Sequence, residues 1–500
     1  MPALTDDLRE RTANLICGSD PAHPLDALFV NAPLRDYDER PRTNDYTLPV
    51  LGMAYIATYA HEVGGFNVGI LDAEAHGLGL KETAQTINRA KPRWVGMNLL
   101  APTYEMSARI AASLDDDIAL MVGGHHAKAM PGRILDDPRM RNLRALVAGE
   151  AEHRVAALLD AEERRAELPE VYWRDKILGT HAAGLCEMRE RRKWLGPDIN
   201  ALPLVNRIFL PQDPYTAADG RVEANIVGSR GCPYNCTFCG AANSVNPDLD
   251  IRPRSPGSIL AELNHLNSTY GATAFRFVDD LFLGAKRIIS EQMDSFSRHK
   301  IGERFVWDAT GRINVLDRLS DAELDELVAN GLREVALGIE SGSDNILNAM
   351  DKRITAAMTE RVATRLMRCG ISVKGYFILG FPGEASDDLN ATANHIHNLW
   401  EIADKYDGSF RASVFEFRPY PGTPVWTSLI EAGHDPDKLL AYGDVDLTQD
   451  GADESMRARD EFNFSVGIQF GDVPLARIRR TLATLTREQH QRNHAQGKAA

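Results

Sequence analysis

The sequence predicts an α/β protein in which an amino-terminal, doubly wound Rossmann-like domain precedes a partial (β/α)6 barrel. Three observations carry this prediction. Short apolar runs alternate with helical patterns in the first third of the chain, a second alternation of the same kind begins at Ala224, and three cysteines fall within eight residues after its first strand. Strands that alternate with helices at this spacing are typical of parallel sheets.

Length and composition limit the function classes. At roughly 100 to 200 residues per domain, the 500 residues correspond to two to four domains. A content of 44% hydrophobic and 25% charged residues excludes wholesale disorder. The formal charge of -15 argues against binding to nucleic acid and favours a neutral or cationic small-molecule substrate. An acidic start without a signal-like apolar stretch, and without a membrane-length run elsewhere, predicts a cytoplasmic protein with no membrane contact.

The first domain is predicted over residues 21–160. Its expected strands are 26–31, 66–71, 94–99 and 118–122, and its expected helices are 51–61, 81–89 and 104–114. Ligands of such sheets bind beyond the carboxyl ends of the strands, where Asn31, Asp72, Asn98 and the pair Gly123 and Gly124 fall. The two glycines fit either a tight turn between strand and helix or the close approach of backbone to a large cofactor.

Residues 161–222 are rich in charge and proline and are predicted to form a linker with a few extended segments. The barrel is predicted over 223–425. Its expected strands are 224–228, 274–278, 305–308, 334–338, 373–379 and 412–417, with helices at 255–268, 321–330 and 355–368. Barrels of this kind carry their chemistry at the carboxyl ends of the strands. Residues 426–500 should form a helical region that ends in an amphipathic helix docked on the barrel.

The cysteine cluster follows the first barrel strand. Cys232, Cys236 and Cys239 have the spacing Cys-x3-Cys-x2-Cys, and clustered thiolates select zinc or an iron-sulfur cluster. A structural zinc site wants a fourth ligand, whereas the next cysteine is Cys369. Three protein ligands leave one position for a substrate or cofactor, although three buried structural thiols are the alternative interpretation.

The segment 228–239 closely resembles the cluster motif of radical SAM enzymes. In that family three cysteines hold a 4Fe-4S cluster and S-adenosylmethionine (SAM) chelates the fourth iron. The resemblance continues in the expected order through 277–282, 310–313, 338–343, 380–384 and 418–424, so that it covers residues 222–425. It implies that Cys232, Cys236 and Cys239 are the cluster ligands.

The same resemblance implies SAM contacts for six barrel residues, namely Phe238, Asp280, Arg312, Glu340, Ser341 and Gly380. Glu340 and Ser341 would lie near the ribose or the methionine end, and Arg312 would pair with the SAM carboxylate. The alternatives are structural, because Asp279 and Asp280 fit a helix N-cap and Gly380 fits a turn.

Tyr215 lies just before the barrel. It is a candidate catalytic hydrogen donor, and the alternative is a packing residue between domains.

The first domain resembles the cobalamin-binding-type domain that precedes the barrel in one radical SAM subgroup. Matching pieces are 31–33, 49–52, 70–73, 122–127 and 148–150. The resemblance implies cobalamin near Asp72, Gly123 and Gly124. The segment 72–77 lacks the Asp-x-His-x-x-Gly spacing of domains that ligate cobalt through histidine, so a bound cobalamin should have no protein imidazole on cobalt.

Together these resemblances imply an enzyme that reductively cleaves SAM, forms a 5'-deoxyadenosyl radical and removes hydrogen from a substrate carbon. An electron donor, either of the flavodoxin or ferredoxin type or a dedicated reductase, is therefore expected. The predicted outcome is cobalamin-dependent C-methylation of a natural-product-like substrate. The alternative is a cobalamin-free radical dehydratase or deoxygenase acting on a polyhydroxylated cationic substrate such as an aminoglycoside.

Two other classes fit less well. A simple electron-transfer protein would need a fourth cluster ligand and no SAM motifs. A tRNA methylthiotransferase would need three more clustered cysteines in its amino-terminal domain, and ahead of residue 161 this sequence has only Cys17.

Overall fold

The computed structural model describes residues 14–39, 48–175, 177–217, 219–246, 251–444 and 464–495. The chain divides into two compact units, Met1–Asp213 and Pro214–Ala500. In the described part of the chain, every helix is too short or too polar to span a bilayer.

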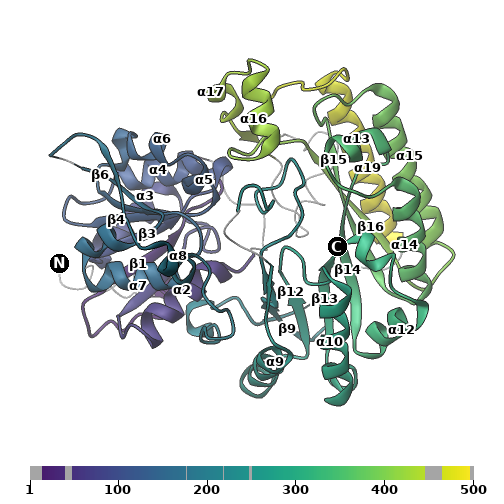
Figure 1. Ribbon diagram of the computed structural model, residues 1–500, viewed down its shortest axis with the longest axis horizontal. Coiled ribbons are helices and arrows are strands. Elements are labelled where there is room, and N and C mark those ends of the chain that lie inside the picture. The colour runs from purple at the N-terminus through teal and green to yellow at the C-terminus, as the bar shows by residue number, and fades with distance from the viewer. Residues whose placement is uncertain are drawn as a thin grey trace. The chain divides into compact units, whose positions relative to one another are not determined.

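The first unit is built on a seven-stranded sheet (Figure 1). Its strands, in spatial order, are β2 (Val68–Asp72), β1 (Ala27–Asn31), β3 (Trp94–Asn98), β4 (Ala119–Gly123), β5 (Leu143–Val147), β6 (Val171–Arg174) and β7 (His181–Ala183). The first five are parallel, and β6 and β7 are antiparallel additions. The central strands are almost wholly buried and apolar, as expected of a parallel sheet covered on both faces.

Helices lie on both faces of this sheet (Figure 1). They are α2 (Leu51–Glu62), α3 (Leu80–Ala90), α4 (Tyr104–Ala112), α5 (His125–Ala129), α6 (Pro131–Leu135), α7 (Glu152–Asp160) and α8 (Met188–Leu195), with 3-10 turns at Ala101–Thr103, Pro138–Met140, Glu162–Glu167 and Arg207–Phe209. The predicted doubly wound fold is confirmed. Each predicted strand and helix of this half is present, with ends that differ by a few residues.

The segment predicted as a linker is more ordered than expected. Most of it belongs to the first unit, where β6 and β7 form a hairpin that extends the sheet. Leu168, which precedes the hairpin, and Val171, the first residue of β6, are buried. The other residues of the hairpin are mostly partly or fully exposed, so the segment shows no apolar period in the sequence.

The second unit holds another seven-stranded sheet. Its order is β16 (Phe410–Glu416), β15 (Ser372–Leu379), β14 (Leu332–Glu340), β13 (Val306–Gly311), β12 (Ala274–Phe277), β9 (Val222–Ile226) and β8 (Tyr215–Thr216). Six strands are parallel, and β8 pairs antiparallel with β9. Two short ribbons join β10 (Ser229–Arg230) to β11 (Arg252–Pro253) and β17 (Gly443–Asp444) to β18 (Phe464–Ser465). This is the predicted six-unit partial barrel.

The helices of this unit are α9 (Pro256–Tyr270), α10 (Lys286–Arg298), α11 (Ile313–Leu316), α12 (Asp321–Ala329), α13 (Asp344–Ala349), α14 (Ala356–Arg368), α15 (Ser386–Ala403), α16 (Pro424–Glu431), α17 (Pro436–Leu439) and α19 (Leu475–Ala495), with a 3-10 turn at Ile301–Glu303. Capping residues in the sequence determine where several of these helices begin. A reciprocal capping box between Ser320 and Glu323 begins α12, for example. Alternate strand residues, such as Val335, Leu337 and Ile339, join the helices in one apolar core.

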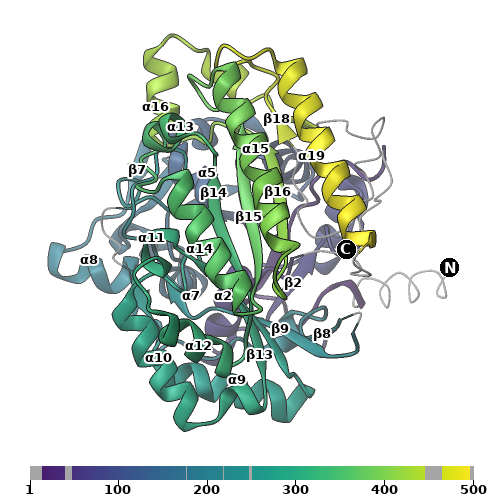
Figure 2. The same ribbon diagram turned by 90° about the vertical axis from the view of Figure 1, so that its right-hand side faces the viewer.

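The terminal helix α19 docks on the barrel as predicted. It lies beside α15 and β16 (Figure 2). Ile478, Leu482 and Leu485 are at most 2% exposed and belong to the barrel core. The Gln489 Oε1 atom accepts hydrogen bonds from the Ala412 amide of β16, at 2.7 Å, and from the Trp400 indole, at 2.9 Å. The helix therefore covers one edge strand and bonds to its backbone.

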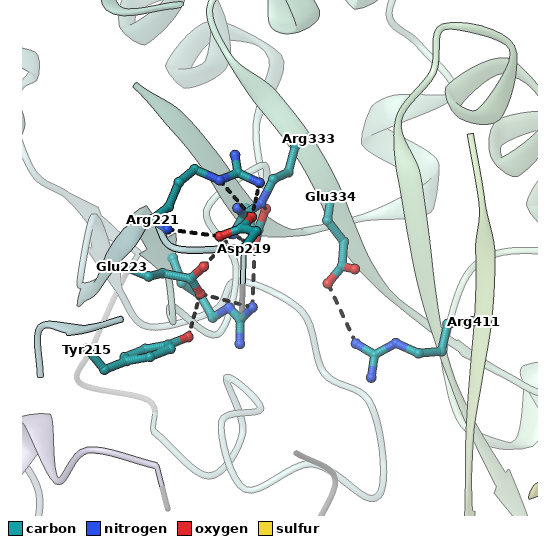
Figure 3. A network of polar contacts seen from close by, with 9 residues as sticks. Tyr215, Asp219, Arg221, Glu223, Arg333, Glu334 and Arg411 are labelled. Carbon is teal, nitrogen blue, oxygen red and sulfur yellow. Dashed lines mark hydrogen bonds and ion pairs between the residues drawn. The ribbon is translucent and has the colours of Figure 1, made fainter. Parts of the chain in front are cut away.

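A charged network lies near the amino ends of four barrel strands (Figure 3). Glu223 accepts hydrogen bonds from the Tyr215 hydroxyl, at 2.6 Å, and from Arg333, at 2.8 Å. Asp308 accepts bonds from Arg333 at 2.6 and 2.7 Å, and Arg276 lies 3.3 Å from both carboxylates. Burial alone would raise the pKa of Glu223, but the Arg276 charge and these hydrogen bonds lower it.

The turn from β15 to α15 contains a buried acid. Gly380 adopts φ +82°, which favours glycine, and its amide donates to Glu384 Oε2 at 2.6 Å. The other carboxyl oxygen of Glu384 is buried without a partner among the described residues. Burial raises the pKa of Glu384 to about 7.

The network predicts unequal effects for two neighbouring acids. Glu223→Ala leaves Arg276, Arg333 and the Tyr215 hydroxyl without a shared acceptor, and we expect the free energy of unfolding to fall by about 2 to 4 kcal/mol. Asp219 makes an exposed pair with Arg221, so Asp219→Ala should leave the urea midpoint unchanged. Equal midpoints for the two variants would contradict this ranking.

Glu384 predicts a pH dependence of stability. Because its folded-state pKa of about 7 exceeds the ordinary 4.5, the folded protein retains a proton that the unfolded chain loses between these values. This stabilisation is complete below pH 4.5 and declines, by on the order of 3 kcal/mol, as the pH rises to 7. Glu384→Gln should remove that slope. Parallel urea titrations of both proteins across this range measure the difference, and identical slopes would contradict the assignment.

Candidate functional site

The cysteine loop begins at the carboxyl end of β9 and is anchored there by Asp279. The amides of Gly228 and Ser229 both donate to Asp279 Oδ1, at 2.8 and 2.7 Å. Asp279 is buried, and its Oδ2 atom has no partner among the described residues. Burial raises the pKa of Asp279 to about 8, against the lowering effect of the two amides. The next helix, α10, begins only at Lys286, so Asp279 and Asp280 do not cap it.

A second anchor holds the middle of the loop. Thr237 lies between two of the cysteines, and its amide donates to the Met350 carbonyl at 3.0 Å. Its own carbonyl accepts from the Val425 amide at 2.9 Å. Phe238 packs against the apolar cluster that includes Met350 and Phe417. The loop is therefore fixed both at its start and between Cys236 and Cys239.

The three cysteine side chains lie near one another. Cys236 is buried, and Cys232 and Cys239 are half-buried. Burial raises the pKa of Cys239 to about 12 and also raises that of Cys232, and in both cases neighbouring thiols and Asp280 add to the effect. A metal centre deprotonates the thiols that bind it, so assembly at this loop must release protons.

Within the described residues, no three Cys, His, Asp or Glu side chains converge as ligands of a single metal ion do. A four-iron cluster binds each thiolate through a different iron, so its ligands stand further apart than those of one zinc ion. The donor set of three thiols on one loop therefore fits a three-thiolate cluster better than structural zinc.

Arg312, at the end of β13, lies against the cysteine loop. Its Nη1 donates to Cys236 Sγ at 3.4 Å, and its Nη2 donates to the Lys352 carbonyl at 2.5 Å. The guanidinium carbon stands 3.9 Å from the centre of the Tyr234 ring. The Nε atom is buried without a partner in the described part of the structure. Arg312 is thus placed beside one of the three cysteines, and its contact with the SAM carboxylate stays a prediction.

Glu340 ends β14 with a left-handed φ of +66°. Its carboxylate pairs with the Lys352 ammonium, and both side chains are buried. Gly338 makes room for this pair, because a Cβ there would lie 2.3 Å from Glu340 Oε1. The neighbouring Ser341 is fully buried, and its hydroxyl lies 2.9 Å from the Thr392 hydroxyl. The polar groups of Glu340 and Ser341, both predicted to contact SAM, therefore already have partners within the protein.

The remaining barrel candidates divide between the two ends of the strands. Asp280 is exposed beside Cys232 and Cys239, whose pKa values it raises. Gly380 lies at the carboxyl end of β15. Tyr215, in contrast, bonds to Glu223 at the start of β9, whereas the cysteine loop follows the end of that strand. The structure does not bring Tyr215 together with the cysteines, and it gives the hydroxyl a structural partner.

Sequence reasoning missed Lys352 and the anchoring role of Asp279. Lys352 lies in the charged stretch Asp351 to Arg353, which in sequence is indistinguishable from a surface turn. A possible signal was Gly338, because a glycine inside a strand marks close approach by another group.

The candidate residues of the first unit lie at or just beyond the carboxyl ends of its parallel strands. Asp72 Oδ1 accepts hydrogen bonds from the Asn31 amide group, at 2.8 Å, and from the Ala75 backbone, at 3.0 Å. Asp72 also lines a small pocket together with Cys17, Ile70, His76 and Phe209–Gln212. Gly124 has φ +92°, and a Cβ there would lie 2.1 Å from Asn98 Oδ1. The turn itself therefore requires glycine at 124.

Next to these glycines, His126 is 3% exposed, and its ring centre lies 4.8 Å from that of Tyr104. Burial, assisted by the charge of Arg133, lowers the pKa of His126 to about 4. A buried ring of this kind is a packing residue, in line with a cobalamin site without a histidine ligand. The edge formed by Asn31, Asp72, Asn98 and Gly123 offers polar groups and open backbone that fit such a cofactor.

Two family models match the chain. The model of the radical SAM superfamily matches residues 226–396, and that of the B12 binding domain matches residues 42–159. The first spans the cysteine loop and the barrel strands up to β15, and the second spans the doubly wound sheet from α2 to α7. The radical SAM model implies a 4Fe-4S cluster and SAM, and the B12 model implies cobalamin.

Known proteins share both regions. An uncharacterized methyltransferase of Pyrococcus horikoshii is 30% identical over 76% of this chain and 78% of its own. The cytidylyl-2-hydroxyethylphosphonate methyltransferase of Streptomyces wedmorensis is 24% identical over 78% and 79%. Among solved structures, the radical SAM methyltransferase TsrM from Kitasatospora setae, with cobalamin and a 4Fe-4S cluster bound, superposes with a TM-score of 0.60 at 17% identity, over 81% of this chain and 78% of its own.

The last comparison shows a shared fold. The 30% identity over most of both chains, together with the two domain matches, shows the family. The chain is an enzyme that belongs to the radical SAM superfamily, in the group whose barrel follows an amino-terminal B12 binding domain.

Proposed function

We propose that this enzyme methylates a carbon atom of a small-molecule substrate and uses a 4Fe-4S cluster, SAM and cobalamin. The observation that carries the proposal is the presence, in one chain, of an anchored three-cysteine loop on a partial barrel and a B12 binding domain. The names of the two relatives, both methyltransferases, support the same outcome.

The proposal assigns the cluster to Cys232, Cys236 and Cys239. When bound, the cluster and SAM supply a 5'-deoxyadenosyl radical, and cobalamin supplies the methyl group. The chain's own share is to bind and orient these groups and to exclude water from them. Asp279 fixes the direction in which the loop leaves β9, and Arg312 donates to Cys236, which places a positive charge beside the cluster.

SAM contacts are assigned to residues at the carboxyl ends of the strands, namely Phe238, Asp280, Arg312, Glu340 and Gly380. Ser341, the sixth residue for which the resemblance implies a SAM contact, has its hydroxyl bonded to Thr392. Cobalamin contacts are assigned to the edge of the first sheet that holds Asp72, Gly123 and Gly124. We do not assign a catalytic role to Tyr215, because its hydroxyl bonds at the opposite end of β9.

The proposal includes an electron donor of the flavodoxin or ferredoxin type, or a dedicated reductase, because the chemistry starts with one electron delivered to the cluster. It also includes a cytoplasmic location. The described chain has six free cysteines and no disulfide, which suits a reducing compartment. The acidic chain favours a neutral or cationic substrate and disfavours nucleic acid.

The cluster assignment predicts the result of removing its ligands. Anaerobically reconstituted wild-type protein should hold one 4Fe-4S cluster, and the triple variant in which Cys232, Cys236 and Cys239 become Ala should hold none. Iron and sulfide analysis measures both. The control is Cys369→Ala, whose thiol lies beside Asp325 on the helical side of the barrel and whose loss should leave the iron content unchanged. Equal iron in the triple variant would refute the assignment.

Cobalamin retention distinguishes methylation from the dehydratase alternative. Protein incubated with hydroxocobalamin and desalted should retain one equivalent. Its spectrum should show no histidine on cobalt, because the segment 72–77 lacks the Asp-x-His-x-x-Gly spacing of domains that ligate cobalt through histidine. During turnover, S-adenosylhomocysteine should then accumulate together with 5'-deoxyadenosine. If 5'-deoxyadenosine forms while no cobalamin is retained, the methylation proposal fails and a cobalamin-free dehydration or deoxygenation takes its place.

A further inference from the structure

One turn of the barrel contacts three parts of the candidate site. Residues 349–353 connect α13 to the segment before α14. Thr237 of the cysteine loop donates through its amide to the Met350 carbonyl, at 3.0 Å, and through its hydroxyl to the Ala349 carbonyl, at 3.3 Å. The turn therefore lies directly behind the loop that carries Cys236 and Cys239.

Lys352 in this turn joins two more elements. Its ammonium pairs with Glu340 at the end of β14, and its carbonyl accepts from Arg312 Nη2 at the end of β13. Arg312 in turn donates to Cys236 Sγ at 3.4 Å. The Lys352 ammonium also lies 5.7 Å from the ring centre of Phe238. A single buried residue thus connects the cluster side of the site to the side assigned to SAM.

The backbone around this connection is unusual. Asp351, Arg353 and Glu340 all adopt left-handed φ values, between +47° and +66°, which non-glycine residues rarely adopt. Such conformations persist only where the surrounding structure requires them, and they concentrate at functional sites. At Gly338, a Cβ would approach Glu340 Oε1 to 2.3 Å and the Lys352 ammonium to 2.6 Å. The pair therefore needs glycine at 338 and lies beside residues in unusual backbone conformations.

A purely structural role for the Lys352–Glu340 ion pair is the simpler explanation, but it does not account for the contacts that Lys352 makes with the residues around the cysteine loop. A buried pair adds little net stability, because desolvation offsets the attraction. The charged network at the opposite end of the strands already supplies pairs of that kind. The Lys352 pair differs because Lys352 also contacts Arg312, which donates to Cys236, and Phe238 of the cysteine loop.

We propose that Lys352 is a positioning residue. Its ammonium orients the Glu340 carboxylate toward bound SAM, and its carbonyl orients the Arg312 guanidinium against Cys236. The inference rests on the proposed function, since the contact between Glu340 and SAM belongs to it. It adds a residue that touches neither the cluster nor SAM and acts through two residues that do.

Substitution of the ammonium alone tests this role. Lys352→Met keeps the length of the side chain and the carbonyl that holds Arg312. The variant should therefore assemble the cluster with the iron and sulfide content of the wild type. Without the pair to orient Glu340, it should bind SAM about 10- to 100-fold more weakly by calorimetry. The change that SAM causes in the EPR spectrum of the reduced cluster should be reduced or absent.

Two further variants make the test specific. Lys352→Arg restores a cation and should recover most of the SAM affinity. Lys300→Met makes the same substitution at another lysine with a left-handed φ, whose side chain is 70% exposed and pairs with Glu303, so its affinity should equal that of the wild type. If Lys352→Met does not fold, Gly338→Ala carries the same expectation, because the added Cβ displaces the pair while both charged residues remain.

Three results would overturn the role of Lys352. They are unchanged SAM affinity in Lys352→Met, loss of iron in that variant, which would make Lys352 a structural support of the loop, and failure of Lys352→Arg to restore affinity. All readouts use the full-length reconstituted protein without substrate or cobalamin. A failure of cobalamin retention would therefore refute methylation without affecting this result, whereas wild-type protein that binds no cluster would refute the proposed function itself.

Discussion

The architecture of this enzyme depends on fixing an irregular loop at the end of a parallel sheet. Backbone groups in such a loop need partners that regular structure does not supply. Asp279 supplies them at the start, where one carboxylate oxygen accepts two successive amides, and the Thr237 contacts supply them in the middle. The first contact needs β9 and β12 to be parallel neighbours with Phe277 opposite Ile226, so the sheet register itself determines where the loop begins.

In the barrel, a stabilising ion-pair network and the candidate site lie at opposite ends of the strands. At the amino ends, two acids and two arginines satisfy one another across four strands (Figure 3). At the carboxyl ends, buried polar atoms such as Asp279 Oδ2, Arg312 Nε and Glu384 Oε1 have no partner among the described residues. Unpaired buried groups cost free energy, and the presence of several at the end that carries the cysteines is typical of a site that a ligand completes.

The helices, strands and cysteine loop could be predicted from the sequence, because the residues that specify each of them lie close together in the chain. Apolar runs bounded by turn residues located the six parallel barrel strands, since the packing that selects them repeats within each βα unit. Contacts between distant residues left no such signal. Glu223 and Arg333 stand 110 positions apart, and neither is unusual among its neighbours in the chain. Lys352 was missed because the charged stretch around it resembles a surface turn, although Gly338 marks the close approach of another group. The β6 and β7 hairpin was missed because its partly exposed strands carry no apolar alternation.

The contact between Gln489 and the Ala412 amide has a consequence for how the molecule behaves in a crowded solution. An open sheet presents unpaired backbone groups at both of its outer strands, and these are templates for another chain to add a strand. At one side the outer strand β8 has only two residues, too few to act as a template. At the other side, Gln489 of α19 takes the place of the absent neighbouring strand on β16. The terminal helix thereby covers an edge at which another strand could otherwise pair.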